Sequence, residues 1–125
     1  MKSPVKTTDA PAAIGPYSQA ISTGSLLFVS GQLPVDPTTG TIVPGDAKAQ
    51  AAQACKNAQA ILKAAGTNTD SVVKTTVFIT DMADFPLVNE AYKAVFTTPF
   101  PARSCFAVKA LPMNALVEIE LIANI

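Results

Sequence analysis

Strand-forming residues fill two stretches near the beginning of the chain, residues 17–22 and 25–32, and the residues between them, Thr23 and Gly24, are typical of a tight turn. The two stretches therefore predict a β-hairpin. The segment D-P-T-T-G that follows is a second turn, in which Pro37 and Gly40 have their usual roles. It predicts a third, short strand over residues 40–43.

The longest helical pattern covers residues 46–65, where apolar residues recur every three or four positions. We expect Asp46 to cap the start of this helix and Gly66 to end it. Most residues of the apolar stripe are small, so the helix should pack closely on a flat sheet. The stripe consists of Ala51, Cys55, Ala58, Leu62 and Ala65.

The second half of the chain adds three strands and one helix. β-Branched residues predict a strand over 71–80. A helix over 84–96 follows, with Asp84 as its expected cap and Pro86 in its first turn. Two strands over 102–108 and 116–123 are expected to form a final hairpin. The predicted order, β-β-β-α-β-α-β-β, indicates one α+β domain over residues 1–125, with one sheet and two helices.

The last predicted strand alternates strictly, so its two faces differ in character. One face is entirely apolar and should contact the helices; it consists of Val117, Ile119, Leu121 and Ala123. The other face mixes apolar residues with Glu118 and Glu120, and Arg103 and Cys105 of the preceding strand are expected beside them. Such a face is too apolar for open solvent and too charged for a core. It predicts cover by another subunit that leaves a polar pocket.

Composition agrees with an oligomer. Hydrophobic residues make up 49% of the chain and charged residues only 14%, so part of the surface is expected to be an interface. The formal net charge is zero and the lysines form no run, which argues against nucleic-acid binding. No apolar run has the length of a membrane span, and the first residues lack the apolar core of a signal peptide. We therefore expect a cytoplasmic protein that binds no membrane.

Histidine is absent, which excludes Ser-His-Asp and Cys-His nucleophiles and most zinc sites. Any chemistry must use carboxylates, tyrosine, lysine, arginine, backbone groups or bound water. The two cysteines are too few for a disulfide framework. Cys55 belongs to the helical stripe and is expected to be a small buried hydrophobe. Cys105 offers a thiol nucleophile as an alternative, with only Arg103 nearby to lower its pKa.

Arg103, in the segment P-F-P-A-R-S-C, is the only arginine among nine basic residues. Its planar guanidinium can bind a carboxylate through two parallel hydrogen bonds, which lysine cannot do. The alternative is a structural ion pair with Glu118 or Glu120 across the final hairpin. Two glutamates would still leave one carboxylate free, and a partly buried glutamate has a raised pKa that suits a general acid or base.

Two further residues are candidates for contact with a ligand. Tyr17 follows a Gly-Pro pair in I-G-P-Y-S-Q and can present its hydroxyl to a pocket, although aromatic packing at a sheet edge explains it equally well. Gly31, in S-G-Q, lies at a strand end where the backbone can approach a ligand closely.

Four segments together resemble the Rid family (reactive intermediate deaminases, also called YjgF or L-PSP proteins), with RidA as the nearest subgroup. The segments are D-A-P-A-A-I-G-P-Y-S-Q-A, S-G-Q-L-P-V-D-P-T-T-G, V-V-K-T-T-V-F-I-T-D-M-A-D-F, and P-A-R-S-C-F-A-V-K-A-L-P followed by V-E-I-E. The resemblance runs over essentially the full length. It implies a homotrimer of chorismate-mutase-like fold, with a central barrel, outer helices and three clefts between subunits.

The resemblance also implies an activity: hydrolysis of 2-imino acids and their enamine tautomers, such as 2-iminopropanoate and 2-iminobutanoate, to 2-oxo acids and ammonia, with no metal or organic cofactor. By motif, Arg103 would bind the substrate carboxylate and Glu118 would orient or activate the attacking water, while Glu120 matches a less important position. The backbone of Gly31 and Cys105 would contact the substrate. Tyr17 and Asn89 would complete the cleft, some of these groups coming from the neighbouring chain.

Other functions stay open at this point. Some family members are called endoribonuclease L-PSP or translation inhibitors, although zero net charge and the missing histidine argue against RNA cleavage. A sensor or chaperone without catalysis could use the same cleft, although the presence of Arg103 favours the enzyme. The connection T-T-P before F-P-A-R-S is shorter than in some relatives, which affects the expected rim of the cleft.

Overall fold

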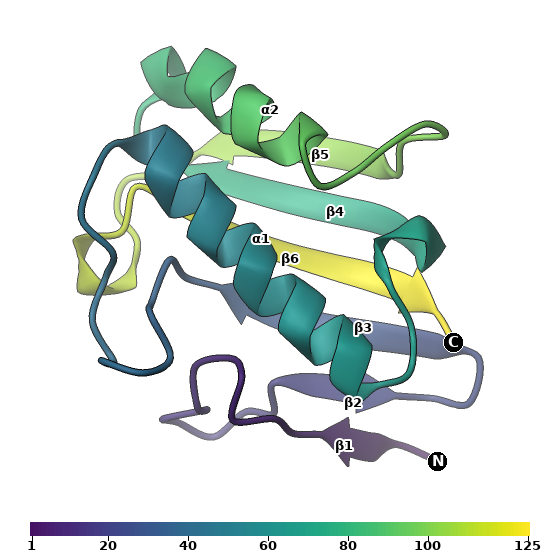
Figure 1. The fold of residues 1–125 in the computed structure, drawn as a ribbon. Helices are drawn as coiled ribbons and strands as arrows, with labels where there is room; N and C mark the ends of the chain where they lie inside the picture. Colours follow the sequence, from purple (N-terminus) through teal and green to yellow (C-terminus); the bar gives the residue numbers. More distant parts are fainter.

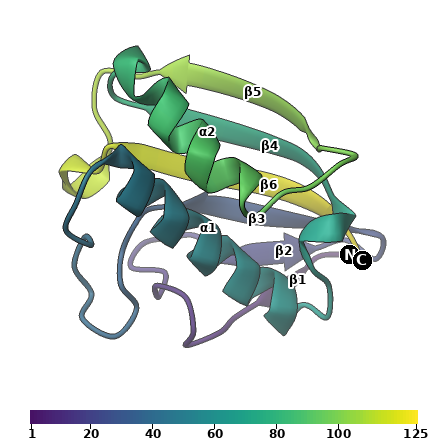
Figure 2. The same ribbon diagram turned by 45° about the horizontal axis from the view of Figure 1, so that its top comes forward.

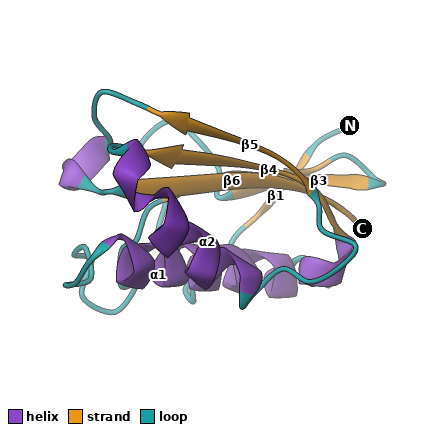
Figure 3. Cartoon of the chain, turned by 90° about the horizontal axis from the view of Figure 1, so that it is seen from above, coloured by secondary structure: helices purple, strands orange, loops and turns teal.

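A computed structural model describes all 125 residues as two layers, one β-sheet and two α-helices on one of its faces (Figures 1 and 3). The strands are β1 (Ser3–Val5), β2 (Ala20–Ser22), β3 (Leu26–Gln32), β4 (Val72–Ile79), β5 (Ala102–Ala107) and β6 (Val117–Asn124). The helices are α1 (Ala47–Ala64) and α2 (Phe85–Lys93). The sheet order is β1-β2-β3-β6-β4-β5, and every pair is antiparallel except β4 with β5. The expected α+β fold with one sheet and two helices is confirmed.

Helix α1 begins and ends where its sequence predicts. The Asp46 side chain accepts a hydrogen bond of 3.0 Å from the backbone N–H of Ala49, which satisfies a free donor of the first turn. After the last turn, Gly66 has φ +81°, the left-handed conformation that glycine adopts without strain. Ala51, Cys55 and Ala58 of its inner stripe are buried and Ala65 is partly buried, so α1 lies close against β3 and β6.

Helix α2 is shorter than expected, because residues 94–96 form a turn rather than a last helical turn. Asp84 makes no capping hydrogen bond; instead, a 3₁₀ turn (Met82–Asp84) precedes the helix and Asp81 caps that turn. The two helices lie side by side on the same face of the sheet, with α2 over β4 and β5 (Figure 2). This position brings α2 to the edge strand β5.

Two predictions about strands near the start of the chain are wrong, although the predicted order of elements happens to match. Residues 40–43 form no strand, because Gly40 is in a turn with φ +74° and only one bridge, Val35 with Ile42, closes the loop. Strand β1 was not expected, since it has three residues and contains Pro4. It pairs with β2 at the edge of the sheet, where proline is tolerated.

The expected final hairpin is also wrong. Strand β4 lies between β5 and β6: Phe78 pairs with Phe106 on one side and with Glu118 on the other. Because β5 pairs with β4 and not with β6, the face of each β5 residue is set by its partner in β4. Thr75 of β4 is buried under the helices and pairs with Arg103, so Arg103 lies on the helix-covered face. The mixed face therefore carries Ser104 and Phe106 in place of Arg103 and Cys105.

The core lies between the helices and the sheet. The apolar face of β6 is at most 2% exposed and packs there with Ile61 and Leu62 of α1 and Phe96 after α2. The opposite face of the sheet has no covering layer in the chain, and it exposes Phe28 and Phe106 to about half their surface (43% and 53%). Neither helix is long and apolar enough to cross a membrane.

Candidate functional site

Arg103 lies near the start of the edge strand β5, where helix α2 holds its guanidinium. The guanidinium NH1 donates a hydrogen bond of 2.8 Å to Oδ1 of Asn89. The guanidinium carbon is 4.8 Å from the ring centre of Tyr92 and 5.4 Å from that of Phe85, both within the range of cation–π attraction. Phe85, Asn89 and Tyr92 are four and three residues apart, so they share one face of the helix.

The alternative of a structural ion pair for Arg103 is wrong. The single ion pair in the structure joins Lys48 and Glu90, at 3.4 Å on the outer side of the helices. The groups around Arg103 are neutral: one amide and two aromatic rings. Arg103 is also exposed to solvent. A cation held in place without an anion is suited to bind the carboxylate of a ligand.

Glu118 lies on the other face of the sheet, against Gly31 of β3. Val117 and Ile119 on either side of it are fully buried under the helices, so strand alternation directs Glu118 away from them. The pairing of β3 with β6 shifts between Val29 and Gln32, and Gly31 lies in this bulge. A Cβ atom at Gly31 would lie only 2.8 Å from Cδ of Glu118. Glycine therefore makes the space in which this carboxyl group lies.

The pKa of Glu118 is raised, mainly because burial penalises the charged carboxylate, and further by the negative charge of Glu120. Glu118 is half-buried, whereas Glu120 is exposed. No cation lies in an ion pair with Glu118. The expectation of a partly buried glutamate with a raised pKa is thus confirmed, and such a group can take a proton from water and return it.

Tyr17 lies in the loop before β2 and is 50% exposed. It lines a hollow of about 270 Å³ that Gly31, Gln32 and Met113 also line. Gln19 fixes the segment before Tyr17: its side-chain amide accepts from the N–H of Thr7 and donates to the carbonyl oxygens of Thr7 and Pro11. Tyr17 and Gly31 therefore share one surface, and Gly31 is the residue of this surface against which Glu118 lies.

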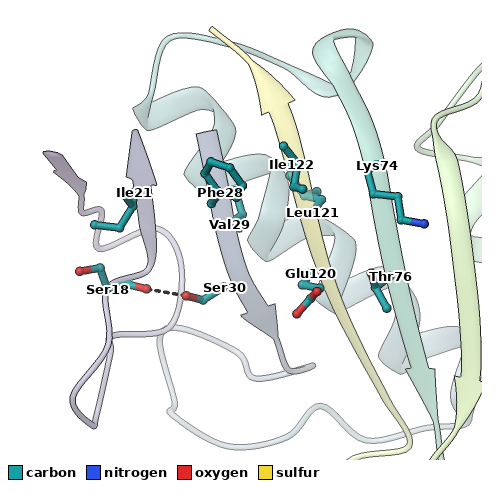
Figure 4. A pocket seen from close by; sticks show the side chains of 10 residues that line it. All are labelled: Ser18, Ile21, Phe28, Val29, Ser30, Lys74, Thr76, Glu120, Leu121 and Ile122. Carbon is teal, nitrogen blue, oxygen red and sulfur yellow. Dashed lines mark hydrogen bonds between the residues drawn. The ribbon is translucent and has the colours of Figure 1, made fainter. Parts of the chain in front are cut away.

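A second hollow, of about 290 Å³, lies on the uncovered face of the sheet (Figure 4). Figure 4 shows Glu120 and Thr76 on neighbouring strands, with Lys74 farther along β4 and Phe28 across the hollow. Lys74 donates a 3.0 Å hydrogen bond to Ser104 rather than to Glu120. Glu120 thus faces this hollow, while Glu118 lies against Gly31. Neither Arg103 nor Glu118 lines either of the two hollows.

Cys105 lies two residues after Arg103 on the same face of β5 and packs against the edge of the core. Burial raises the pKa of its thiol, and the positive charge of Arg103 opposes this only in part. Burial raises the pKa of Cys55 to about 12. Both thiols are therefore protonated near neutral pH, which disfavours a thiolate nucleophile. Cys55 is 1% exposed, as its place in the helical stripe predicts.

The candidate residues gather in two groups, not one. We call Tyr17, Gly31 and Glu118 the acid half-site, and Asn89, Arg103 and Cys105 the arginine half-site. Arg103 of β5 pairs with Thr75 of β4, and Glu118 of β6 pairs with Phe78, which is three residues after Thr75 on the same strand. Strand geometry then separates their Cα atoms by about 14 Å, with the two side chains on opposite faces. One small substrate cannot contact both groups within a single chain.

Sequence reasoning missed the residues that hold Arg103: Phe85, Tyr92 and Thr75. A signal was present, because Phe85, Asn89 and Tyr92 have helical spacing within the predicted helix over 84–96. Their contact with Arg103 was not predictable without knowing that β5 pairs with β4 in parallel. Three or more cysteine, aspartate or glutamate side chains gather nowhere in a group that could hold a metal ion.

Comparisons with known proteins agree over nearly the whole chain. The family model described as endoribonuclease L-PSP matches residues 7–125. A RutC family protein of Sinorhizobium fredii is 55% identical over 100% of this chain and 99% of its own. A mouse protein named 2-iminobutanoate/2-iminopropanoate deaminase is 52% identical over 95% of this chain and 88% of its own.

A solved structure gives the same result for the fold. A Yersinia pestis protein described as a member of the conserved Rid protein family superposes with a TM-score of 0.97 at 49% identity, over 100% of both chains. These matches confirm the resemblance that four sequence segments indicate. The chain belongs to the Rid family, which the matching model describes as endoribonuclease L-PSP.

Proposed function

We propose that the protein hydrolyses 2-imino acids, such as 2-iminobutanoate and 2-iminopropanoate, to 2-oxo acids and ammonia. The observation that carries the proposal is Arg103, an arginine held by neutral groups and without an anionic partner. Its remaining N–H donors can bind a carboxylate, which every 2-imino acid has next to the reacting carbon. The name of the mouse relative supports the same substrate class.

The chemistry needs only the groups that the two half-sites offer. A protonated imine carbon is already electrophilic, so positioning and a weak base suffice. Arg103 would bind the carboxylate, and Glu118 would take a proton from water as its oxygen attacks C2. The protonated Glu118 would then give that proton to the nitrogen. As the C–N bond breaks, Glu118 would take the proton of the new hydroxyl group, which leaves the carbonyl of the 2-oxo acid, and would pass it to the departing ammonia. A raised pKa suits Glu118 to these transfers.

We further propose that the complete site forms between two chains of a homotrimer. Three observations support this: the distance between the half-sites within one chain, the uncovered sheet face, and the exposed Phe28 and Phe106 on that face. The arginine half-site belongs to an edge strand, where a second chain can approach. Light scattering should give three times the chain mass of 12.9 kDa. A monomer that is fully active would contradict the shared site.

The activity test generates 2-iminobutanoate in situ from threonine with a threonine dehydratase and follows 2-oxobutanoate with and without the protein. Wild type should accelerate product formation, and Arg103→Ala should abolish the effect. Lys93→Ala is the matched control, because it removes one exposed positive charge near the end of the same helix α2 and should leave the rate unchanged. Equal rates for wild type and Arg103→Ala would refute the proposal.

The family description also raises RNA cleavage as a second function. Zero net charge and the absence of histidine remain arguments against it. Cleavage of RNA by purified wild type that Arg103→Ala also retains would favour the second function. We expect the deaminase reaction to take place in the cytoplasm, which cell fractionation tests.

A further inference from the structure

Arg103 is held by contacting residues, and one of these residues, Tyr92, is itself held by a further hydrogen bond. The guanidinium rests against Tyr92, and the hydroxyl of Tyr92 shares a 2.7 Å hydrogen bond with the hydroxyl of Thr75. Thr75 is fully buried and is the residue of β4 that pairs with Arg103 itself. The contacts therefore run from Arg103 of β5 through Tyr92 of α2 to Thr75 of β4, and Thr75 pairs with Arg103 across the two adjacent strands.

We propose that Tyr92 is a positioning residue for Arg103, and that the buried hydroxyl pair of Tyr92 and Thr75 fixes the ring that the guanidinium rests on. This inference rests on the proposed function in one respect, because it assumes that Arg103 binds the carboxylate of a substrate. It gives a role to Tyr92 and Thr75, which contact no substrate themselves. We call Thr75, Phe85, Asn89 and Tyr92 the arginine support.

Packing alone does not require the hydroxyl groups of Tyr92 and Thr75. Tyr92 is 5% exposed and its ring also packs on Phe96, with centroids 4.4 Å apart. A phenylalanine would fill that space equally well, and a valine would replace Thr75 with the same shape. Burying two hydroxyl groups gains little for stability over apolar groups of the same shape, provided that both change together. Their directional bond, however, fixes the tilt of the ring.

The neutrality of the support is also informative. Arg103 contacts an amide oxygen and two rings, none of which competes as an anion for the guanidinium. The amide occupies NH1, so the support restricts rotation of the flexible side chain and leaves other donors free. Binding then loses less side-chain entropy than it would with a mobile arginine. An exposed arginine at an edge strand would otherwise be free to adopt many rotamers.

The first test is spectroscopic and needs no ligand. Because Arg103 is the only arginine, the chain gives a single arginine Nε–H signal in a ¹⁵N NMR spectrum. In wild type this signal should be shifted by the aromatic rings and should have the relaxation of a rigid group. Tyr92→Leu should move it toward the position of a free arginine and make it mobile. A mobile, unshifted signal in wild type would overturn the proposal.

The second test measures carboxylate binding by native protein, with 2-oxobutanoate as the probe and calorimetry as the readout. Tyr92→Leu should weaken binding about two- to thirty-fold, the range of a cation–π contact. Tyr92→Phe keeps the ring and should lose less. Thr75→Val should equal Tyr92→Phe, and the double variant should be no worse than either. In the dehydratase assay, KM should rise in the same order while kcat changes less than the KM does.

Val88→Ala is the matched control, because it removes buried volume from the same helix and Val88 does not belong to the arginine support. It should lower the melting temperature and leave the affinity and the arginine signal unchanged. If Tyr92→Leu behaves like Val88→Ala, the role of Tyr92 is only structural and the proposal fails. If wild type binds 2-oxobutanoate and the variants follow the predicted order, but no imine is hydrolysed, the support stands and the proposed function fails.

Discussion

The carboxyl group of Glu118 occupies the space that any side chain at position 31 would need. Its Cδ atom lies 2.8 Å from where a Cβ of Gly31 would be, in the bulge of β3. The glycine is thus required by the position of the glutamate and not by its own backbone angles. Gly31 and Glu118 consequently form one unit, in which the smallest residue allows the charged residue to lie against the strand.

Gly31→Ala should move the Glu118 carboxyl group and lower deaminase activity about 100-fold, because a misplacement of the order of 1 Å is costly in catalysis. Stability should change little, since the clashing atoms belong to the end of a flexible side chain. The rate and the melting temperature are both measured. Ser30→Ala, next to it on β3, is the control and should keep the activity. Full activity of Gly31→Ala would show that Glu118 can act from another position.

Glu118→Gln should stabilise the protein at neutral pH while it lowers activity at least 100-fold. The raised pKa means that the folded state holds its proton more tightly than the unfolded state, whose pKa is about 4.5. This contribution to stability is therefore complete below pH 4.5 and is lost as the pH rises through the folded pKa. Melting temperatures from pH 4 to 8 test this.

In that series, wild type should lose stability relative to Glu118→Gln as the pH increases, and the two curves should converge in acid. Glu120→Gln should have a smaller effect, because Glu120 is exposed and acts only through its charge on Glu118. A constant difference between wild type and Glu118→Gln at all pH values would contradict the raised pKa.

Asn89→Asp should weaken substrate binding more than Asn89→Ala does. The new carboxylate would lie 2.8 Å from the Arg103 guanidinium, at the position of the present amide oxygen. It would form an internal ion pair and compete with the carboxylate of the substrate. We expect KM to rise about tenfold or more, the loss of one charge-assisted hydrogen bond. An unchanged KM in Asn89→Asp would indicate that Arg103 does not bind the substrate carboxylate.

Asn57→Ala should destabilise the fold by about 1 to 3 kcal/mol, the cost of leaving buried polar groups without partners. The Asn57 amide donates to the carbonyl oxygens of Leu33 and Val35, so it ties α1 to the loop that follows Gly31. Chemical denaturation measures the free energy of unfolding. Gln53→Ala removes only a side chain that donates to Asn57 and should cost less.

Local signals predicted most of the fold. The cap at Asp46, the end of α1 at Gly66 and the alternation of β6 depend on neighbours in the sequence, and the structure has all three. The parallel pairing of β5 with β4 was not predictable, because it depends on how α2 returns the chain to the sheet. That one error reversed the face of Arg103.

The candidate site was likewise predictable in part. Arg103 and Glu118 were identifiable from residue type, since one is the sole arginine and the other lies in an apolar strand. Their places on opposite faces of the sheet were not identifiable. The resemblance implied clefts between subunits, but it did not say which of these two residues each chain supplies. Thr75 gave no sequence signal and Tyr92 gave only its helical spacing with Phe85 and Asn89, as tyrosine and threonine are also ordinary core residues when they share a hydrogen bond.

The central claim is that Arg103 of one chain and Glu118 of another make one deaminase site, and complementation between inactive variants tests it directly. Arg103→Ala and Glu118→Gln are mixed, unfolded, refolded together and tested in the dehydratase assay. In a closed ring with random assembly, about a quarter of the sites combine an intact Arg103 with an intact Glu118. We predict recovery to about a quarter of wild-type activity. A mixture as inactive as each variant alone would contradict the claim.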